Sequence, residues 1–98
     1  MQLGKDIKIM KAIVTVIGKD QVGIIAMVCT LLAKHNANIL NITQTIMQEN
    51  FVMVMLVDLD ACTTTLDKLS EALSESGAGM GLSIRIQRED IFNAMHRI

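Results

Sequence analysis

The side chains that could do chemistry in this 98-residue chain are few and widely spaced. His35 and His96 are the only histidines, and neither stands at the spacing of a metal-ligand pair or of a catalytic triad. His35 ends a helical pattern, where a cation complements the helix dipole. Cys29 and Cys62 form no CxxC pair, and Cys29 falls inside an apolar helix pattern, as a buried inert thiol does. The sequence therefore predicts no catalytic residue, no metal site and no cofactor.

The segment GKDQVGIIAMVCTLLAKHNANI, residues 18–39, is more informative, because two turns flank an apolar helix pattern. A phosphate-binding P-loop needs several glycines and a Lys-Ser/Thr pair that opens the helix. Here only Gly18 and Gly23 flank the first turn, and Lys19 precedes the second glycine. A Rossmann fingerprint is absent as well, so neither nucleotide-binding motif explains the segment.

The chemistry of the two turns fits a small zwitterionic ligand. Gly23 has no Cβ, so a ligand or another chain can approach the backbone there. The free N–H groups of the helix start favour a carboxylate, Asp20 can accept a bond from an ammonium group, and Asn38 can both donate and accept. Structural roles are equally open to these residues: Asp20 can cap the helix, Gly23 can permit close packing and Asn38 can occupy a turn.

The composition limits the partners that we expect. Hydrophobic residues make up 51% of the chain, charged residues 19%, and the net charge is −1. This balance gives no electrostatic reason to expect nucleic acid or an anionic membrane as a partner. No apolar run approaches the roughly 18 residues of a membrane-spanning helix, and the first ten residues do not resemble a secretory signal. We therefore expect a cytoplasmic location.

Hydrophobic periodicity predicts strands at residues 10–17, 39–48, 51–60 and 81–88, and helices at residues 22–35, 64–76 and 90–98. A capping box of Thr64 and Asp67 marks the start of the second helix, and Gly77 its end. This order predicts the α+β class: a ferredoxin-like βαββαβ sandwich, whose four-stranded antiparallel sheet has two helices on one face, with a short C-terminal helix. Right-handed crossovers place the first and third strands in the centre of the sheet. Residues 1–9 are expected to be an N-terminal extension, and residues 10–98 a single domain.

The register of the predicted hairpin decides which side chains share a face. We expect a two-residue loop at Glu49 and Asn50. The pairs expected under the helices are Ile46–Met53, Gln44–Met55, Ile42–Val57 and Leu40–Leu59. The opposite face is half apolar, and no other element of the expected fold covers it. Such a face indicates a partner, most simply a second copy, unless it is a partly wet sheet face; the edge strands offer another route to self-association.

The segment from Ala12 to Thr45, AIVTVIGKDQVGIIAMVCTLLAKHNANILNITQT, resembles an ACT domain. The D-x-x-G turn of Asp20 and Gly23, followed by an aliphatic residue, and the Asn-Ile step into the second strand carry this resemblance. The similarity extends over about residues 10–88. The ending REDIFNAMHRI resembles that of a family of small stand-alone ACT-domain proteins of unassigned function. The pattern is also similar to each half of the glycine-cleavage-system transcriptional repressor.

The resemblance implies a non-catalytic regulatory domain that forms a homodimer and binds a small metabolite, often an amino acid, at the interface. The positions that match the family's ligand contacts are Asp20, Gln21, Val22, Gly23, Ile24, Asn38 and Ile39. The sequence departs from the family at Val22, where many members have proline. It also departs at Gly18, where some amino-acid sensors carry a polar side chain, and this second departure argues against serine-type recognition.

About 20 Å of helix separates the two turns, so residues from both turns that contact one ligand must come from different subunits. The alternative function is that of a regulatory adaptor, a protein–protein interaction module that docks a partner protein on its open sheet face without a ligand.

Overall fold

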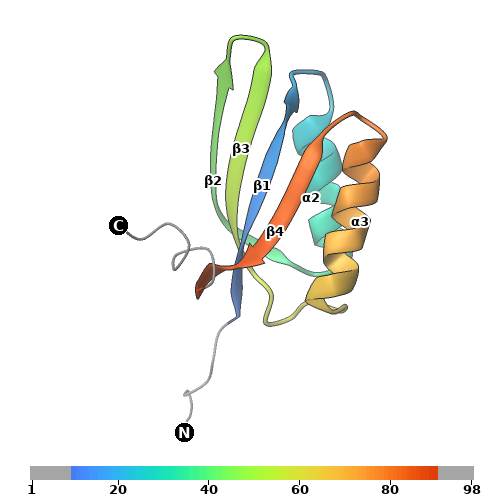
Figure 1. Cartoon of the computed structure of the whole chain (residues 1–98). Coiled ribbons are helices and arrows are strands. Elements are labelled where there is room, and N and C mark those ends of the chain that lie inside the picture. Colours follow the sequence, from blue (N-terminus) through green and yellow to red (C-terminus); the bar gives the residue numbers. More distant parts are fainter. Residues whose placement is uncertain (1–9, 91–98) are drawn as a thin grey trace, which may run out of the picture.

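The computed structural model describes residues 10–90, and its elements follow the predicted order. The strands are β1 (Lys11–Lys19), β2 (Asn38–Met47), β3 (Asn50–Asp58) and β4 (Ser83–Arg88), and the helices are α2 (Ile24–Lys34) and α3 (Leu66–Ala78). The antiparallel sheet has the order β2-β3-β1-β4, and both helices cover the same face (Figure 1). The ferredoxin-like βαββαβ fold and the central position of β1 and β3 are thus confirmed. The expected extension over residues 1–9, and the expected C-terminal helix beyond residue 90, lie outside the described residues.

The core lies between the sheet and the two helices, because alternate strand residues point toward the helices. The side chains buried in it include Ala12, Val14 and Val16 of β1 and Phe51, Met53, Met55 and Val57 of β3. The helices contribute side chains at positions one turn apart, Ile24, Val28 and Leu32 from α2 and Leu69 and Leu73 from α3. Two methionines, Met53 and Met55, therefore fill the centre of the sheet, where their flexible thioethers take part of the packing role of aromatic residues in a chain with no tryptophan or tyrosine.

The β2–β3 hairpin turns one residue earlier than predicted. Its loop consists of Gln48, at a φ of 60°, and Glu49, and Met47 pairs with Asn50 across the hairpin. The loop predicted at Glu49 and Asn50 is therefore wrong. Asparagine favours turns, but Asn50 pairs with Met47 on one side and with Lys19 on the other, and both pairings hold it in the sheet.

The pairing between β2 and β3 consequently shifts by two residues from the predicted register. Ile46 lies opposite Phe51 rather than Met53, and each residue from 41 to 47 is displaced in the same way. Because strand side chains alternate with a period of two, this shift leaves every one of these side chains on its predicted face. An irregularity between Ile39 and Asn41 makes Leu40 an extra residue, so the predicted pairing of Leu40 with Leu59 is wrong.

The helices cover β2 much less than predicted. Ile42 and Ile46 share the helix side of the sheet with their buried partners Met55 and Phe51, yet they are 40% and 56% exposed. Figure 1 shows β2 at the edge of the sheet away from both helices. The prediction that Ile42 and Ile46 lie under the helices is therefore wrong. The helix layer is displaced toward the opposite edge, where α3 packs on β4.

The ends of α3 also differ from the predicted ones. Thr65, not Thr64, caps the helix, because its hydroxyl accepts a hydrogen bond of 3.2 Å from the backbone N–H of Lys68. The capping box of Thr64 and Asp67 is therefore wrong by one residue. Gly77 does not end the helix, which continues to Ala78. A Cβ at Gly77 would lie 2.8 Å from the side chain of Ile84, so this glycine lets α3 approach β4 closely.

Candidate functional site

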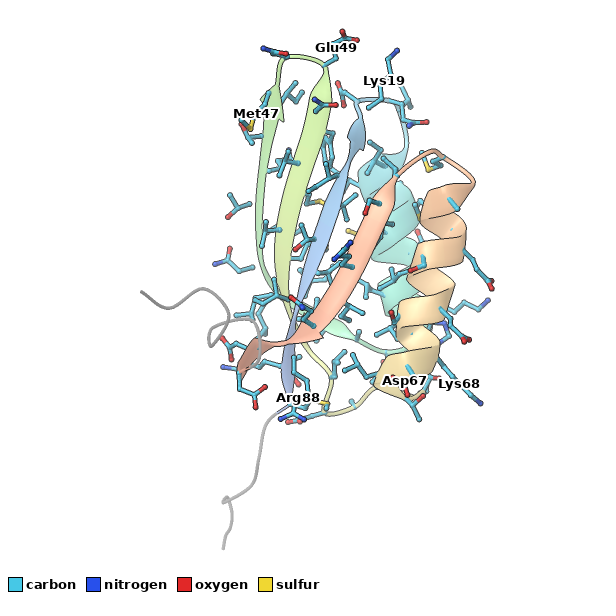
Figure 2. The ribbon with its side chains drawn as sticks, in the orientation of Figure 1. Lys19, Met47, Glu49, Asp67, Lys68 and Arg88 are labelled. Carbon is cyan, nitrogen blue, oxygen red and sulfur yellow. The ribbon has the colours of Figure 1, made fainter. Side chains whose placement is uncertain are left out.

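The turn at residues 20–23 lies at the end of the molecule where the β2–β3 hairpin turns. The backbone N–H of Asp20 donates a 3.0 Å hydrogen bond to the carbonyl oxygen of Glu49. The Nζ of Lys19 lies 4.0 Å from the Oε1 of the same glutamate, and both side chains are about four-fifths exposed. Figure 2 shows Lys19, Glu49 and Met47 together at this end. Because exposed ion pairs stabilise little, the backbone bond is what fixes the turn against the hairpin.

Gln21 serves the structure of the turn. Its side-chain amide donates hydrogen bonds of 3.2 Å to the carbonyl oxygen of Lys19 and 2.8 Å to that of Met80. The second bond ties the turn to the loop between α3 and β4. Both bonds involve the amide N–H₂ group, so the position predicted to contact a ligand is used to join two loops.

The start of α2 carries no side-chain cap. Gly23 is its N-cap, at a φ of 94°, and the first turn contains no acidic residue. Asp20 therefore does not cap the helix, and within the described residues its carboxylate accepts no hydrogen bond. A Cβ built at Gly23 would meet nothing within 4 Å, so this glycine provides the backbone conformation of the turn and not close packing. The neighbouring Val22 is 97% exposed.

Gly18 packs closely against Leu82, which leaves no room for a larger side chain at position 18. A Cβ at this position would lie 2.5 Å from the Cδ2 of Leu82, which is itself 6% exposed. Leu82 thus occupies the space that a polar side chain at position 18 would need. The sequence departure noted at Gly18 is consistent with this apolar packing.

Two of the predicted contact residues belong to the core or its border. Ile24 is 2% exposed, and Ile39 is half-buried and packs against the core. Their side chains stabilise the ends of α2 and β2. Within the predicted set, the residues exposed to solvent are Asp20, Gln21, Val22, Gly23 and Asn38, and among them Gln21 uses its side-chain amide to join two loops.

Asn38 lies at the other end of α2. It is the first residue of β2 and pairs with Asp58 of β3. The residue that makes the turn is Asn36, at a φ of 61°, whose Nδ2 donates a 3.0 Å hydrogen bond to the carbonyl oxygen of Ala61. The expected turn role of Asn38 thus falls to Asn36, and the side chain of Asn38 is exposed.

One chain does not bring the two turns together. They stand at opposite ends of α2, whose 11 residues give it a length of about 16 Å. This agrees with the separation expected from the sequence. A site that contains both Asp20 and Asn38 needs a second chain.

Sequence reasoning missed the exposed apolar edge that lies between these two turns. Leu40, Ile42, Ile46 and Met47 of β2 are 45%, 40%, 56% and 62% exposed. The signal for this edge was present in the predicted strand order, which puts the second strand at an edge with an unpaired backbone. We call these four residues the β2 edge patch.

The rest of the described structure was searched for other candidate binding sites. An open groove between α2 and α3 is lined by Ala26, Met27, Thr30, Leu31, Lys34 and Ser76. Among residues 10–90, no three histidine, cysteine, aspartate or glutamate side chains converge as metal ligands. No helix in the same range combines the length and the apolar character needed to cross a bilayer.

Comparison with known proteins identifies the family. The ACT domain family model matches residues 11–87. A UPF0237 protein of Clostridium acetobutylicum is 56% identical over 89 residues, which cover 91% of this chain and all of that protein. The structure of an ACT domain protein from Streptococcus pneumoniae superposes with a TM-score of 0.77 at 37% identity, over 91% of this chain and all of the other.

A glycine cleavage system transcriptional repressor has the same fold, with a TM-score of 0.67 at 21% identity. The match covers 81% of this chain and 45% of the repressor. Both resemblances stated from the sequence, to small stand-alone ACT-domain proteins and to this repressor, are thus confirmed. The chain belongs to the ACT domain family, and within it resembles the small UPF0237 proteins along nearly its whole length.

Proposed function

We propose that this chain is a non-catalytic regulatory domain that binds an amino acid at the interface of a homodimer. The observation that carries the proposal is the course of β2. This strand runs from Asn38, at one end of α2, to the hairpin that holds the Asp20 turn, at the other end. It is also an edge strand with an exposed apolar patch, which is the kind of surface that a second copy covers.

Antiparallel pairing of β2 between two copies would extend the sheet to eight strands. The Asn38 end of β2 in one copy then lies beside the hairpin end of β2 in its partner. Each end of the dimer therefore carries Asn38 from one copy and the Asp20 turn from the other. The partner's turn follows β1, three strand spacings or about 14 Å from Asn38. A small metabolite, together with the side chain of Asn38 on one side and the side chain of the partner's Asp20 on the other, can bridge this distance of about 14 Å. In the same arrangement Ile42 and Ile46 of both copies meet on the helix side.

The exposed groups suit the two charges of an amino acid. The uncapped start of α2 has N–H groups and a positive dipole end for the carboxylate. Asp20 supplies an acceptor for the ammonium group, and Asn38 a donor and an acceptor. The apolar packing of Leu82 over Gly18 leaves no polar group at that position, so we expect the ligand's side chain to be recognised by aliphatic contacts.

Sedimentation tests the dimer. At tens of micromolar we expect wild-type protein to be a dimer and Ile42→Lys to be a monomer. Each copy would bring one lysine to the β2–β2 interface, so the variant dimer would bury two positive charges there. Ile17→Lys is the matched control, since Ile17 is 46% exposed but lies on the opposite sheet face. A wild-type monomer would contradict the proposal, and a dimer lost only in Ile17→Lys would move the interface to the open face.

Calorimetry against the twenty amino acids tests the ligand. We expect saturable heat with an aliphatic amino acid and none with serine. The absence of both heat and thermal shift for the whole panel at millimolar concentration would contradict ligand binding and favour the adaptor function.

A further inference from the structure

The exposed apolar surface at the β2 edge continues onto one side of α2. On this side Ile25 is 38% exposed, and Cys29, one helical turn further along, is half-buried. This side lies opposite the one with Met27 and Leu31, which line the groove toward α3. Because α3 packs on β4, at the far edge of the sheet, the side of α2 that carries Ile25 and Cys29 faces β2 (Figure 1). We call these two residues the α2 flank.

The exposed surface of α2 differs from that of α3 in charge. α3 exposes four charged side chains, those of Asp67, Lys68, Glu71 and Glu75. The exposed residues of α2 are Ile25, Ala26, Thr30, Ala33 and Lys34. Only the last of these is charged. A helix whose outer side faces water normally carries charges there, as α3 does. The surface of α2 is instead typical of a helix that another protein surface partly covers.

β2 alone provides too little surface for a stable interface. A specific interface buries about 800 Å² and about 20–30 residues on each partner, whereas β2 has 10 residues. The proposed dimer therefore needs surface next to β2. On the open face of the sheet, β2 presents mostly polar side chains, in the order Asn41, Thr43, Thr45 and Met47. On the helix side β2 presents Ile42 and Ile46, with Gln44 between them, and the next element is α2 with its apolar flank. The apolar part of the interface thus extends toward α2.

We propose that the second copy in the dimer covers the α2 flank as well as β2, so that the α2 helices of the two copies face each other above the β2–β2 interface. Ile25, Cys29 and Ile42 of both copies then form one apolar cluster around the two-fold axis. This inference rests on the proposed dimer and names the other half of its interface. It holds whether or not an amino acid binds.

The expected distance between the two α2 helices fits such a contact. α3 lies over β4, and packed helices are about 10 Å apart, which is about two strand spacings. α2 therefore lies over β3. In a β2–β2 dimer the β3 strands of the two copies are three strand spacings apart, or about 14 Å. A helix with its side chains is about 10–12 Å wide, so the side chains of the α2 flank and of Ile42 fill the gap that remains.

α2 also lies level with the middle of β2. The turn before α2 is held at the hairpin end of β2 by the hydrogen bond from Asp20 to Glu49, and three residues separate the end of α2 from the start of β2. The two-fold axis of an antiparallel β2–β2 pair passes near the middle of the strand. Cys29, the middle residue of α2, is therefore the flank residue nearest to the axis. The two helices run antiparallel, and the favourable pairing of opposite dipole ends supports the arrangement.

Sedimentation of two lysine variants tests the α2 contact separately from the β2 contact. We expect Ile25→Lys to raise the dissociation constant of the dimer about 10-fold or more, because the dimer would bury two unpaired charges. Thr30→Lys is the matched control and should leave the constant unchanged, since Thr30 is exposed on α2 but borders the groove toward α3. If Ile25→Lys dimerises like wild-type protein while Ile42→Lys is a monomer, this inference is overturned and the β2 dimer stands. A wild-type monomer would contradict the proposed dimer and this inference with it.

Cross-linking with a short bismaleimide tests the geometry of the contact. Cys62→Ser leaves Cys29 as the only cysteine, and Cys29→Ser leaves Cys62; both thiols are half-buried. Cys62 follows β3, at the end of the sheet where β2 begins, so the two copies of Cys62 lie at opposite ends of the dimer. We expect a covalent dimer from Cys62→Ser and none from Cys29→Ser. In protein that sediments as a dimer, the reverse result, or no cross-link through Cys29, would overturn the inference.

Discussion

Gly77 and Gly18 are positions at which another residue's side chain fills the space of the missing Cβ. Ile84 approaches Gly77, and Leu82 approaches Gly18, so both glycines let β4 and the loop before it pack on the rest of the molecule. This role differs from that of Gly23, where the backbone conformation matters and the space is open. Glycine in a sequence thus marks either a conformation or a contact, and the neighbours in three dimensions decide which.

Replacement of Gly77 by alanine should destabilise the fold, although alanine is the better helix former. The new methyl group would lie 2.8 Å from Ile84, and the cost of overpacking exceeds the gain in helix propensity, for a net loss of about 1–2 kcal/mol in the free energy of unfolding. Chemical denaturation measures the loss. Gly79→Ala is the control, because its Cβ would meet its nearest neighbour at 3.5 Å. The addition of Ile84→Ala, which removes both crowding atoms, Cδ1 and Cγ1, should make Gly77→Ala cost less than it does beside Ile84; an unchanged cost in that background would contradict the steric account.

The two neighbouring threonines before α3 provide a second test at the residue scale. Thr65→Ala should lower the free energy of unfolding by about 1 kcal/mol, because the N–H of Lys68 loses its acceptor. Thr64→Ala removes no capping bond and should cost clearly less. Equal losses in denaturant titrations of the two variants would show that the cap is not the cause.

The elements were predictable because their signals are local. Alternation marked the strands, a stripe at helical spacing marked α3, and the single arrangement compatible with right-handed crossovers gave the strand order. The register of the β2–β3 hairpin could not be predicted from the sequence. Asn50 favours a turn locally, but its pairing with strands on both sides holds it in the sheet. The exposure of Ile42 and Ile46 could not be predicted either. It depends on how far the two helices are displaced across the sheet toward β4, and this displacement is set by the packing of α3 on β4. The separation of Asp20 from Asn38 was predictable, because the length of α2 alone fixes it.

A cross-strand pair in β2 and β3 tests this offset at the element scale. Met55 is fully buried and its partner Ile42 is 40% exposed. At protein concentrations low enough to keep the chain monomeric, Met55→Ala should lower the free energy of unfolding by about 3 kcal/mol and Ile42→Ala by less than about 1 kcal/mol. If the proposed dimer forms through β2, the effect of Ile42→Ala should grow as the protein concentration rises, because dimer formation then contributes to stability. An effect of Ile42→Ala that is large and independent of concentration would show that this side chain is covered within one chain.

The whole molecule has an exposed apolar edge on β2 and two turns whose polar groups suit the two charges of an amino acid, and the proposed dimer uses both features. In the proposed dimer a second copy covers the β2 edge patch, and the Asp20 turn of one subunit lies at the same end as Asn38 of the other. Each metabolite site is then made of Asp20 from one subunit and Asn38 from the other. In this proposal the site is complete only in the dimer, so we expect metabolite binding and dimer formation to be coupled.

A calorimetric titration of mixed variants tests this shared site most directly, with the amino acid that binds wild-type protein as the probe. Asp20→Ala and Asn38→Ala should each abolish binding when present alone. Mixing the two variants forms heterodimers in which one site has lost both residues and the other has kept both. The account predicts that binding returns in the mixture, with one ligand per heterodimer and wild-type affinity. A mixture that binds no better than either variant alone would contradict a site shared between subunits.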